Sequence, residues 1–214
     1  MRLIKFLLSF LLTLSLFSQE IIRLPSPQTK GEKSLEEILF LRRSRRQYKK
    51  APLKLKEVSQ ILWAGYGVTA SWGGKTTPSA GALYPLEIYI VVGDVLNLKK
   101  GIYKYQPQGH YLIKISNKDK RENLYKAALY QKWIRETPLN IIICADFSKT
   151  TKKYGERGKR YVYMEAGHCA QNIYLEVESL NLATVAVGAF QDKKIKKILN
   201  IKSQPLYIMP VGRR

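Results

Sequence analysis

The segment 157–180 constrains the fold most strongly, because it carries two apolar stripes at helical spacing. The first stripe consists of Val162, Ala166, Cys169, Ile173, Val177 and Leu180, and the second of Tyr163, Gly167, Ala170 and Tyr174. A helix with two apolar faces is expected to be covered on two sides. Its small residues would let another backbone approach closely, which favours a subunit interface. The central helix of a monomer is the alternative.

The other periodicities predict one α+β domain over residues 34–214, without internal repeats. We expect helices at 35–46, 55–65, 118–133 and 191–199, and strands at 88–92, 102–105, 111–115, 139–145, 185–187 and 206–211. Residues 19–33 lack apolar periodicity and are expected to be a linker. Residues 65–85 contain five glycines and two prolines, which predicts a long loop.

Residues 1–18 have the pattern of a secretory signal peptide. Arg2 and Lys5 precede an apolar run over residues 6–17, and the chain then turns polar. The run is shorter than the roughly 20 apolar residues that a spanning helix needs. Leu16 and Phe17 form a poor cleavage site, so an uncleaved membrane anchor is the alternative. We therefore expect an exported protein, periplasmic or otherwise extracytoplasmic.

Charge and composition exclude some classes of function. The formal charge of +21 predicts a surface that attracts anions, although charge alone does not choose among nucleotide, nucleic acid and lipid. No nucleic-acid motif accompanies it, so we expect no nucleic-acid partner. Two cysteines, Cys144 and Cys169, and two histidines are too few for a structural zinc site, and no metal is expected. His168 and Cys169 are read as packing residues.

Four arginines crowd the end of the first predicted helix. The run Arg42-Arg43-Ser44-Arg45-Arg46 supplies planar donors and a hydroxyl, which suit a fork around a phosphate. One or two cations at a helix C-terminus only offset the macrodipole. Four arginines exceed that need, since like charges four positions apart, such as those of Arg42 and Arg46, repel each other unless an anion lies between them. A solvated charged surface is the alternative.

The motif PSAGALYPLE over residues 78–87 leads directly into a predicted strand. A loop of small residues leaves backbone amides and carbonyls open to a flat ligand, which an ordinary turn does not require.

Five separated motifs resemble the SagB-type branch of the FMN-dependent nitroreductase family. They are the arginine run 42–46, the loop 78–87, the segment 153–168 that contains KYGER and EAGH, the sequence VAVGAF at 185–190, and the closing PLY and PVG at 205–212. The resemblance covers roughly residues 34–212. It implies a nitroreductase-like α+β homodimer, with an antiparallel-rich mixed sheet flanked by helices and two FMN molecules at the subunit interface.

The resemblance also assigns cofactor-binding residues. The FMN phosphate and pyrimidine edge would be held by Arg42, Arg43, Ser44 and Arg46. The isoalloxazine ring would be lined, from the partner subunit, by Pro78, Ser79, Gly81, Ala82 and Leu83. Flavin N5 would face backbone at Val187, Gly188 and Ala189, and Arg213 or Arg214 would add a last phosphate contact.

Two features of the resemblance bear on chemistry. Lys153 and Tyr154 match the Lys-Tyr pair that azoline-oxidising members use to remove a proton. The alternative is that Tyr154 packs and Lys153 is solvated. The commoner nitroreductase loop has Asn and Gln where Ala82 and Tyr84 stand here, so hydrogen bonds to flavin would come from backbone or elsewhere.

We therefore expect an exported FMN-dependent oxidoreductase that passes hydride through flavin N5 by ping-pong turnover. Its electron donor would be a small molecule such as NAD(P)H. One alternative is a SagB-type azoline dehydrogenase acting on a peptide, against which the signal peptide argues. Another is a flavin- or anion-binding protein without turnover.

Overall fold

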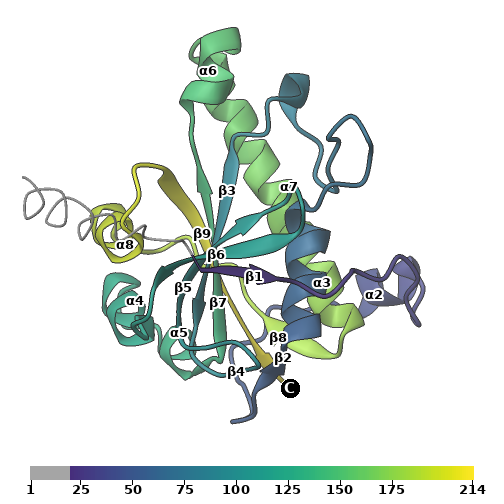
Figure 1. Cartoon of the computed structure of the whole chain (residues 1–214), viewed down its shortest axis with the longest axis vertical. Helices are drawn as coiled ribbons and strands as arrows, with labels where there is room; N and C mark the ends of the chain where they lie inside the picture. The colour runs from purple at the N-terminus through teal and green to yellow at the C-terminus, as the bar shows by residue number, and fades with distance from the viewer. Residues whose placement is uncertain (1–19) are drawn as a thin grey trace, which may run out of the picture.

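The computed structural model describes residues 20–214, which are built around a seven-stranded sheet (Figure 1). The strand order is β1-β6-β5-β3-β7-β9-β8, and all neighbours are antiparallel. The strands are β1 (Ile21–Arg23), β3 (Leu86–Val92), β5 (Gly101–Gln106), β6 (Tyr111–Ser116), β7 (Leu139–Ala145), β8 (Leu182–Thr184) and β9 (Gln204–Arg213). Outside this sheet, β2 (Leu53–Lys54) and β4 (Val95–Leu96) pair in parallel.

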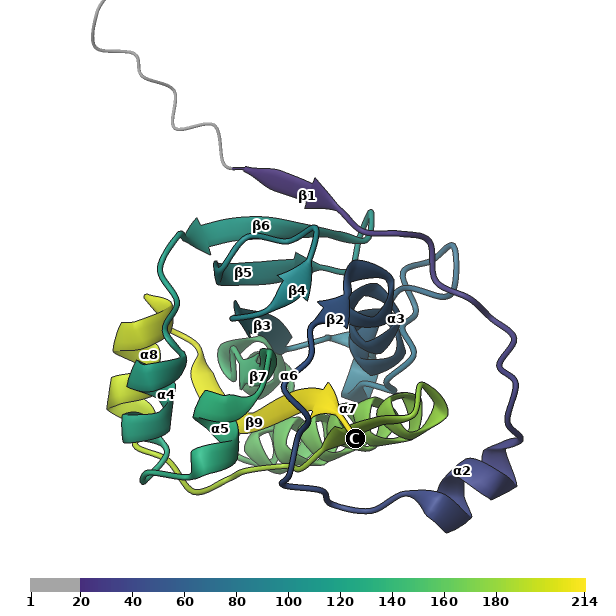
Figure 2. The same cartoon turned by 90° about the horizontal axis from the view of Figure 1, so that it is seen from below.

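Helices cover both faces of the sheet and give three layers, as Figure 2 shows. One face carries α3 (Leu55–Tyr66) and α7 (Arg157–Ser179), and the other carries α4 (Arg121–Ala127), α5 (Lys132–Glu136) and α8 (Asp192–Leu199). Two short helices, α2 (Leu35–Leu41) and α6 (Ser148–Tyr154), and a 3-10 turn, η1 (Ala80–Ala82), complete the fold. The predicted α+β class is confirmed.

The central strands are buried on both faces, which explains their near-continuous apolar sequence. In β3, Ile88 and Ile90 face α3 and α7, whereas Tyr89 and Val91 face the other three helices. This is the alternation of side chains that a pleated strand imposes. Strand β7 lies beside β3 over its whole length, from Leu139 to Ala145. The two strands therefore form the rigid centre on which both helical layers rest.

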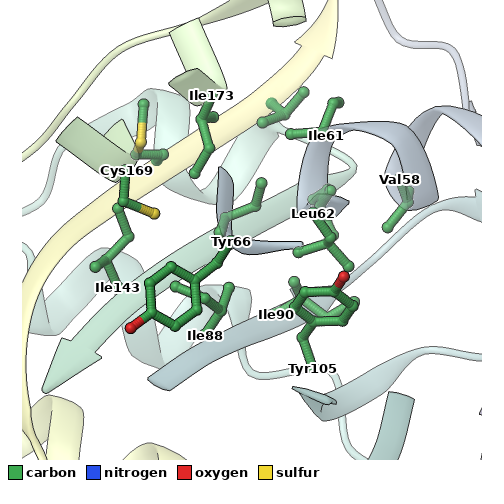
Figure 3. Packing of buried hydrophobic residues seen from close by; sticks show 14 of the residues in the cluster. Val58, Ile61, Leu62, Tyr66, Ile88, Ile90, Tyr105, Ile143, Cys169 and Ile173 are labelled. Atoms are coloured by element: carbon green, nitrogen blue, oxygen red, sulfur yellow. The ribbon is translucent and has the colours of Figure 1, made fainter. Parts of the chain in front are cut away.

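The α3–α7 layer packs closely because of one glycine. Figure 3 shows Ile61, Leu62 and Tyr66 of α3 meeting Cys169 and Ile173 of α7 above the strands. A Cβ built on Gly65 would lie 2.9 Å from Ile173 Cγ1, so glycine is what allows this approach. Cys169 is buried here as a free thiol, and Cys144 is buried on the other side of the sheet, in agreement with their predicted packing roles.

The first predicted helix is shorter than expected. Ser34 does cap it, since its Oγ accepts from the Glu37 amide at 3.1 Å, but α2 ends at Leu41 instead of residue 46. The arginine run therefore follows the helix as non-helical chain. The physical reason is tertiary, because the Arg45 amide donates to the Thr184 carbonyl at 2.9 Å and draws the backbone toward β8.

Other boundaries also differ from the sequence predictions. The predicted linker 19–33 begins with β1, an edge strand that pairs with β6. The predicted helix 118–133 divides into α4 and α5, because Leu129 and Tyr130 adopt positive φ angles of 56° and 61°. The strand predicted at 185–187 is wrong, because the strand in this region is β8 at residues 182–184, and of the three predicted residues only Val187 forms an isolated bridge, to Ile208. Helix α6 was not predicted.

The predicted exported location is corrected. Within residues 20–214, no helix is long and apolar enough to cross a membrane. Residues 1–18, on which the predicted signal peptide and anchor rest, lie outside the described part of the chain. Export therefore forms no part of the function proposed below.

Candidate functional site

The predicted phosphate fork lies against the second half of α7. The Ser44 hydroxyl is 2.9 Å from the Tyr174 hydroxyl, which also accepts from the Ala186 amide at 2.7 Å. The guanidinium of Arg42 stacks 5.0 Å from the centroid of the Tyr174 ring. Tyr174 thus joins the arginine run to the segment that leads into Val187.

Arg46 contacts the helical layer on the other face of the sheet, which contains α5. Its guanidinium stacks 5.6 Å from the Trp133 ring of α5, and the buried Trp133 Nε1 has no hydrogen-bond partner within residues 20–214. The neighbouring Gln131 donates through Nε2 to the Ala189 carbonyl at 3.0 Å. Arg46 and the predicted flavin-facing segment 187–189 are therefore supported by the same turn and helix.

The segment 187–189 presents open backbone. Val187 is buried and exchanges two backbone hydrogen bonds of 2.9 Å with Ile208, which fixes the segment to β9. Gly188 and Ala189 are exposed, and a Cβ on Gly188 would meet nothing within 4 Å. A flat ligand could therefore approach this backbone directly.

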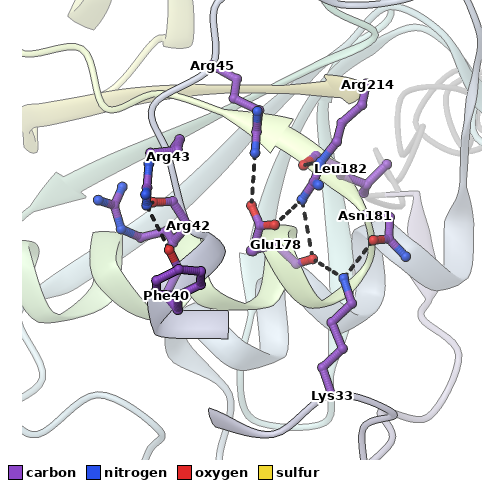
Figure 4. A network of polar contacts seen from close by, with 9 residues as sticks. All are labelled: Lys33, Phe40, Arg42, Arg43, Arg45, Glu178, Asn181, Leu182 and Arg214. Carbon is purple, nitrogen blue, oxygen red and sulfur yellow. Dashed lines mark hydrogen bonds and ion pairs between the residues drawn. The ribbon is translucent and has the colours of Figure 1, made fainter. Parts of the chain in front are cut away.

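The other arginines of the run have structural partners, as Figure 4 shows. Arg43 donates through Nη1 to the Phe40 and Arg42 carbonyls at 2.9 and 2.8 Å, and so caps α2. Arg45 Nη2 lies 4.0 Å from the buried carboxylate of Glu178. In the described residues, Arg42 and Arg46 form no ion pair with a carboxylate, so these two remain available for an anion.

Arg213 does not fit its predicted role as a phosphate contact. Its two terminal nitrogens donate to the two carboxylate oxygens of Glu57, both at 2.8 Å, and its Nε donates to the Pro52 carbonyl at 3.2 Å. Arg214 in turn pairs with Glu178 and donates to the Leu182 carbonyl. These side chains fasten the C-terminus to the body of the protein, and we remove Arg213 from the candidate site.

The predicted ring-binding loop lies at the first half of α7. Pro78, Gly81 and Ala82 are exposed, while Ser79 and Leu83 are half-buried. Ser79 Oγ donates to Glu165 Oε2 at 2.6 Å and accepts from the Tyr84 amide at 2.9 Å. The serine therefore closes the loop on one side and leaves its other side open.

Lys153 and Tyr154 meet this loop. Both stand at the end of α6, and a Cβ on Gly81 would lie 2.7 Å from the Tyr154 hydroxyl and 3.0 Å from Lys153 Nζ. The φ of 61° at Gly81 favours glycine, and the missing side chain leaves room for the ends of the Lys153 and Tyr154 side chains. The Tyr154 ring packs edge-on against Tyr161 at 5.2 Å, whereas Lys153 is exposed. The fold therefore brings Lys153 and Tyr154 to the loop.

The two groups of candidate residues are anchored at different places on α7. Glu165, which anchors the loop, and Tyr174, which anchors the fork, are nine positions apart on α7. At about 1.5 Å and 100° per residue, they are separated by about 13 Å along the axis and point to opposite sides. A single small ligand that uses both groups would need one of them from a second copy.

Exposed apolar residues lie on α2, which precedes the arginine run, and on α7, which anchors both groups of candidate residues. On α2, Leu35, Leu39 and Phe40 are exposed, and no residue of this helix is buried. On α7, Tyr163 and Met164 are exposed, and a Cβ on Gly167 would meet nothing within 4 Å. Tyr163 and Gly167 thus lie on the outer side of α7, as expected for the second apolar stripe. Ala170, which was predicted to belong to the same stripe, is instead buried in the core.

Sequence reasoning missed three residues behind the loop. Glu165 is 3% exposed, and burial raises its pKa. Tyr66 donates to its Oε1 at 2.8 Å. Lys75 Nζ lies 4.0 Å from the centroid of the Tyr66 ring, and burial lowers the pKa of Lys75 to about 8. The only available signal was an acid beside an apolar stripe, at position 165. His168, predicted to be a core or interface residue and not a catalytic one, is exposed in the single chain and so does not belong to the core.

A family model decides how these features are classified. The model of the nitroreductase family matches residues 40–213, from the end of α2 to the last residue of β9. The chain belongs to the nitroreductase family. It is therefore a member of a family of oxidoreductases, and the predicted family is confirmed.

Individual nitroreductase relatives agree. The nitroreductase homologue MJ1384 of Methanocaldococcus jannaschii is 52% identical over 183 residues, which cover 86% of this chain and 92% of the relative. The microcin B17-processing protein McbC of Escherichia coli is 26% identical over 144 residues, or 63% of this chain. Those residues are 53% of McbC, about half its length. This similarity supports the SagB-type part of the resemblance.

A solved structure shows the same fold. The crystal structure of a nitroreductase homologue from Ralstonia eutropha JMP134 matches with a TM-score of 0.81 and 28% identity. The match covers 92% of this chain and 90% of the other. The three-layer arrangement is thus that of nitroreductase homologues over nearly the full described chain.

Proposed function

We propose that this nitroreductase-family protein is an FMN-dependent oxidoreductase that works as a homodimer. One observation carries the proposal: the fork at Arg42 and Arg46 and the loop at residues 78–83 lie on opposite sides of α7. Two copies related by a two-fold axis would bring the fork of one beside the loop of the other, and would do so twice. The exposed apolar residues of α2 and the open Gly167 support burial of this face against a second copy.

The donor set fits FMN. Planar guanidiniums and a hydroxyl suit the phosphate, and Arg42 and Arg46 are held by aromatic rings without an ion pair in the described chain. The open backbone at Gly188 and the small residues Gly81 and Ala82 suit the flat ring. Bound FMN would supply hydride transfer at N5, with a donor such as NAD(P)H and an acceptor using the same place in turn by a ping-pong cycle.

A second candidate activity is removal of hydrogen from carbon, as in azoline oxidation on a peptide. It is favoured by the contact of Lys153 and Tyr154 with Gly81, and by the similarity to McbC. In this reading, the pair takes the proton that leaves the carbon. The predicted signal peptide no longer counts against this activity, because export forms no part of the proposed function. Binding of flavin or another anion without turnover is the remaining alternative.

The phosphate fork can be tested with two ligands that differ only by the phosphate. Because charge-assisted hydrogen bonds contribute about 1.5 to 3 kcal/mol, FMN should bind at least about tenfold more tightly than riboflavin. Quenching of flavin fluorescence on titration with the protein measures both affinities. Equal affinities would contradict the fork, and absence of binding by either ligand would contradict the proposed cofactor.

A further inference from the structure

Glu165 is a buried carboxylate without an ion pair. It is 3% exposed, and no lysine or arginine of residues 20–214 lies within 4.0 Å of its oxygens. Its partners are two hydroxyls, with Oε1 accepting from Tyr66 at 2.8 Å and Oε2 from Ser79 at 2.6 Å. Burying a carboxylate is costly unless its hydrogen bonds are satisfied. The two hydroxyls meet that need and at the same time join α7 to α3 and to the loop.

The loop that Glu165 holds is in an unfavourable conformation. Gly81, Ala82 and Tyr84 all have positive φ, at 61°, 54° and 47°. For residues other than glycine this costs about 1 to 2 kcal/mol each, so contacts outside the loop must maintain its shape. The bond from the Tyr84 amide to Ser79 Oγ, at 2.9 Å, closes the loop at the atom that Glu165 holds.

A lysine holds the far end of the same loop. Lys75 Nζ lies 4.0 Å from the centroid of the Tyr66 ring and 4.6 Å from that of Tyr84, and the Lys75 amide donates to the Tyr84 hydroxyl at 3.3 Å. The two rings themselves meet edge-on at 6.2 Å. Tyr66 therefore contacts both Glu165 and Lys75, which reach the loop through Ser79 and Tyr84 respectively.

We propose that Glu165 is a positioning residue, which through Ser79 holds residues 79–84 in the shape that receives the flavin ring. Glu165 contacts no ligand itself, because it lies behind the loop, while Gly81 and Ala82 are exposed on the front. This inference rests on the proposed binding of FMN, but the shape of the loop can be measured without it.

The test compares Ser79→Ala and Glu165→Gln with Ser59→Ala. The control removes the hydroxyl of a buried serine, which donates to the Pro25 carbonyl and lies away from the loop. In protein freed of flavin, amide hydrogen exchange at Tyr84 and its neighbours should become at least about tenfold faster in the first two variants. The amides of β3 and β7 should exchange as in the wild type, and Ser59→Ala should leave the loop unchanged.

FMN affinity gives the second readout. Both loop variants should bind FMN about tenfold more weakly than the wild type. The double variant should bind FMN no more weakly than the single variant with the lower affinity, because the two residues act through one hydrogen bond. Unchanged loop exchange in Ser79→Ala, or wild-type FMN affinity in both variants, would overturn the positioning role. If the wild type binds no FMN while loop exchange still responds, the proposed cofactor fails and the structural link from Glu165 to the loop stands.

Discussion

Glu165 and Tyr174 point to opposite sides of α7, and each anchors one group of candidate residues. Glu165 holds the loop through Ser79, and Tyr174 holds the arginine run through Ser44. In the proposed dimer, a functional site made from both groups would use two copies of the chain. Dimerisation and cofactor binding should be lost together.

The substitution Gly167→Leu tests this link. A Cβ at Gly167 meets nothing in the single chain, so leucine should leave the fold of the protomer intact. In a dimer packed along this side of α7, it should push the two backbones apart and release both the partner and FMN. Light scattering and flavin absorbance measure the two effects on one sample.

Lys194→Leu on α8 is the matched control, since it also adds a leucine at an exposed helical position. It should remain dimeric and loaded with FMN. A stable, FMN-loaded monomer, either of the wild type or of Gly167→Leu, would contradict the two-copy site. A Gly167→Leu dimer that retains its flavin would show that the interface does not lie along this side of α7.

The fork is tested by replacing Arg42 or Arg46 with alanine. Either change should weaken FMN binding by about 1.5 to 3 kcal/mol, because a charge-assisted hydrogen bond to phosphate is lost. Replacement by lysine should rescue only part of the loss, since an ammonium cannot make two parallel bonds. Fluorescence titration measures the affinities, and unchanged affinity in both alanine variants would remove the fork from the account.

Arg213→Ala provides a contrast for the fork. Its guanidinium is bound by Glu57, so its loss should lower the free energy of unfolding by about 1.5 to 3 kcal/mol and leave FMN affinity nearly unchanged. Urea denaturation measures the stability change. A large loss of FMN affinity with normal stability would restore the phosphate contact that the structure argues against.

The pair Lys153→Ala with Tyr154→Phe separates the two candidate activities. Removing a proton from carbon needs a base, whereas reducing flavin with a nicotinamide needs only an aligned hydride. We predict that the double variant keeps FMN and remains reducible, while dehydrogenation of a carbon substrate falls by about 100-fold or more. Loss of flavin would show that the pair is structural. Wild-type rates in both half-reactions would leave general reductase activity as the only one of the two candidates with support.

Glu165 should make stability depend on pH in a defined direction. Burial raises the pKa of Glu165 in the folded protein, so above the unfolded pKa of about 4.3 the folded state binds more protons than the unfolded chain. Its stabilising contribution is therefore present at low pH and lost as pH rises through the folded pKa. The neighbouring Lys75, Lys149 and Tyr66 are common to wild type and variant.

The measurement is the difference in Tm between wild type and Glu165→Gln, followed from about pH 4 to 7. This difference should move in favour of the variant as pH rises, because glutamine does not titrate. A constant difference, or one that moves in favour of the wild type, would show that the Glu165 pKa is not raised.

Most of the fold could be predicted from periodicity because the main elements are strongly patterned. The two stripes of 157–180 correspond to α7, and the apolar run 139–145 corresponds to β7. The predicted boundaries are wrong where tertiary contacts determine the backbone conformation. Nothing in the sequence ends a helix at Leu41, but the bond from the Arg45 amide to Thr184 does. Leu129 and Tyr130 break a helical pattern without a glycine or proline.

The candidate site was predicted in part, from motifs with a physical purpose. The arginine run and the loop of small residues could be recognised because their composition exceeds what local structure needs. The pairing of Arg213 with Glu57 could not, since it joins residues from opposite ends of the domain. Lys75 and Tyr66 gave no sequence signal, because their role depends on packing around Glu165.

FMN-dependent oxidoreductase activity is tested most directly by the visible absorption spectrum of the purified protein, loaded with FMN, before and after addition of NADH, NADPH or dithionite. We predict a bound flavin spectrum that dithionite bleaches, that at least one nicotinamide also bleaches, and that an added electron acceptor restores. A protein that takes up no flavin, or whose bound flavin none of the three donors reduces, would contradict it.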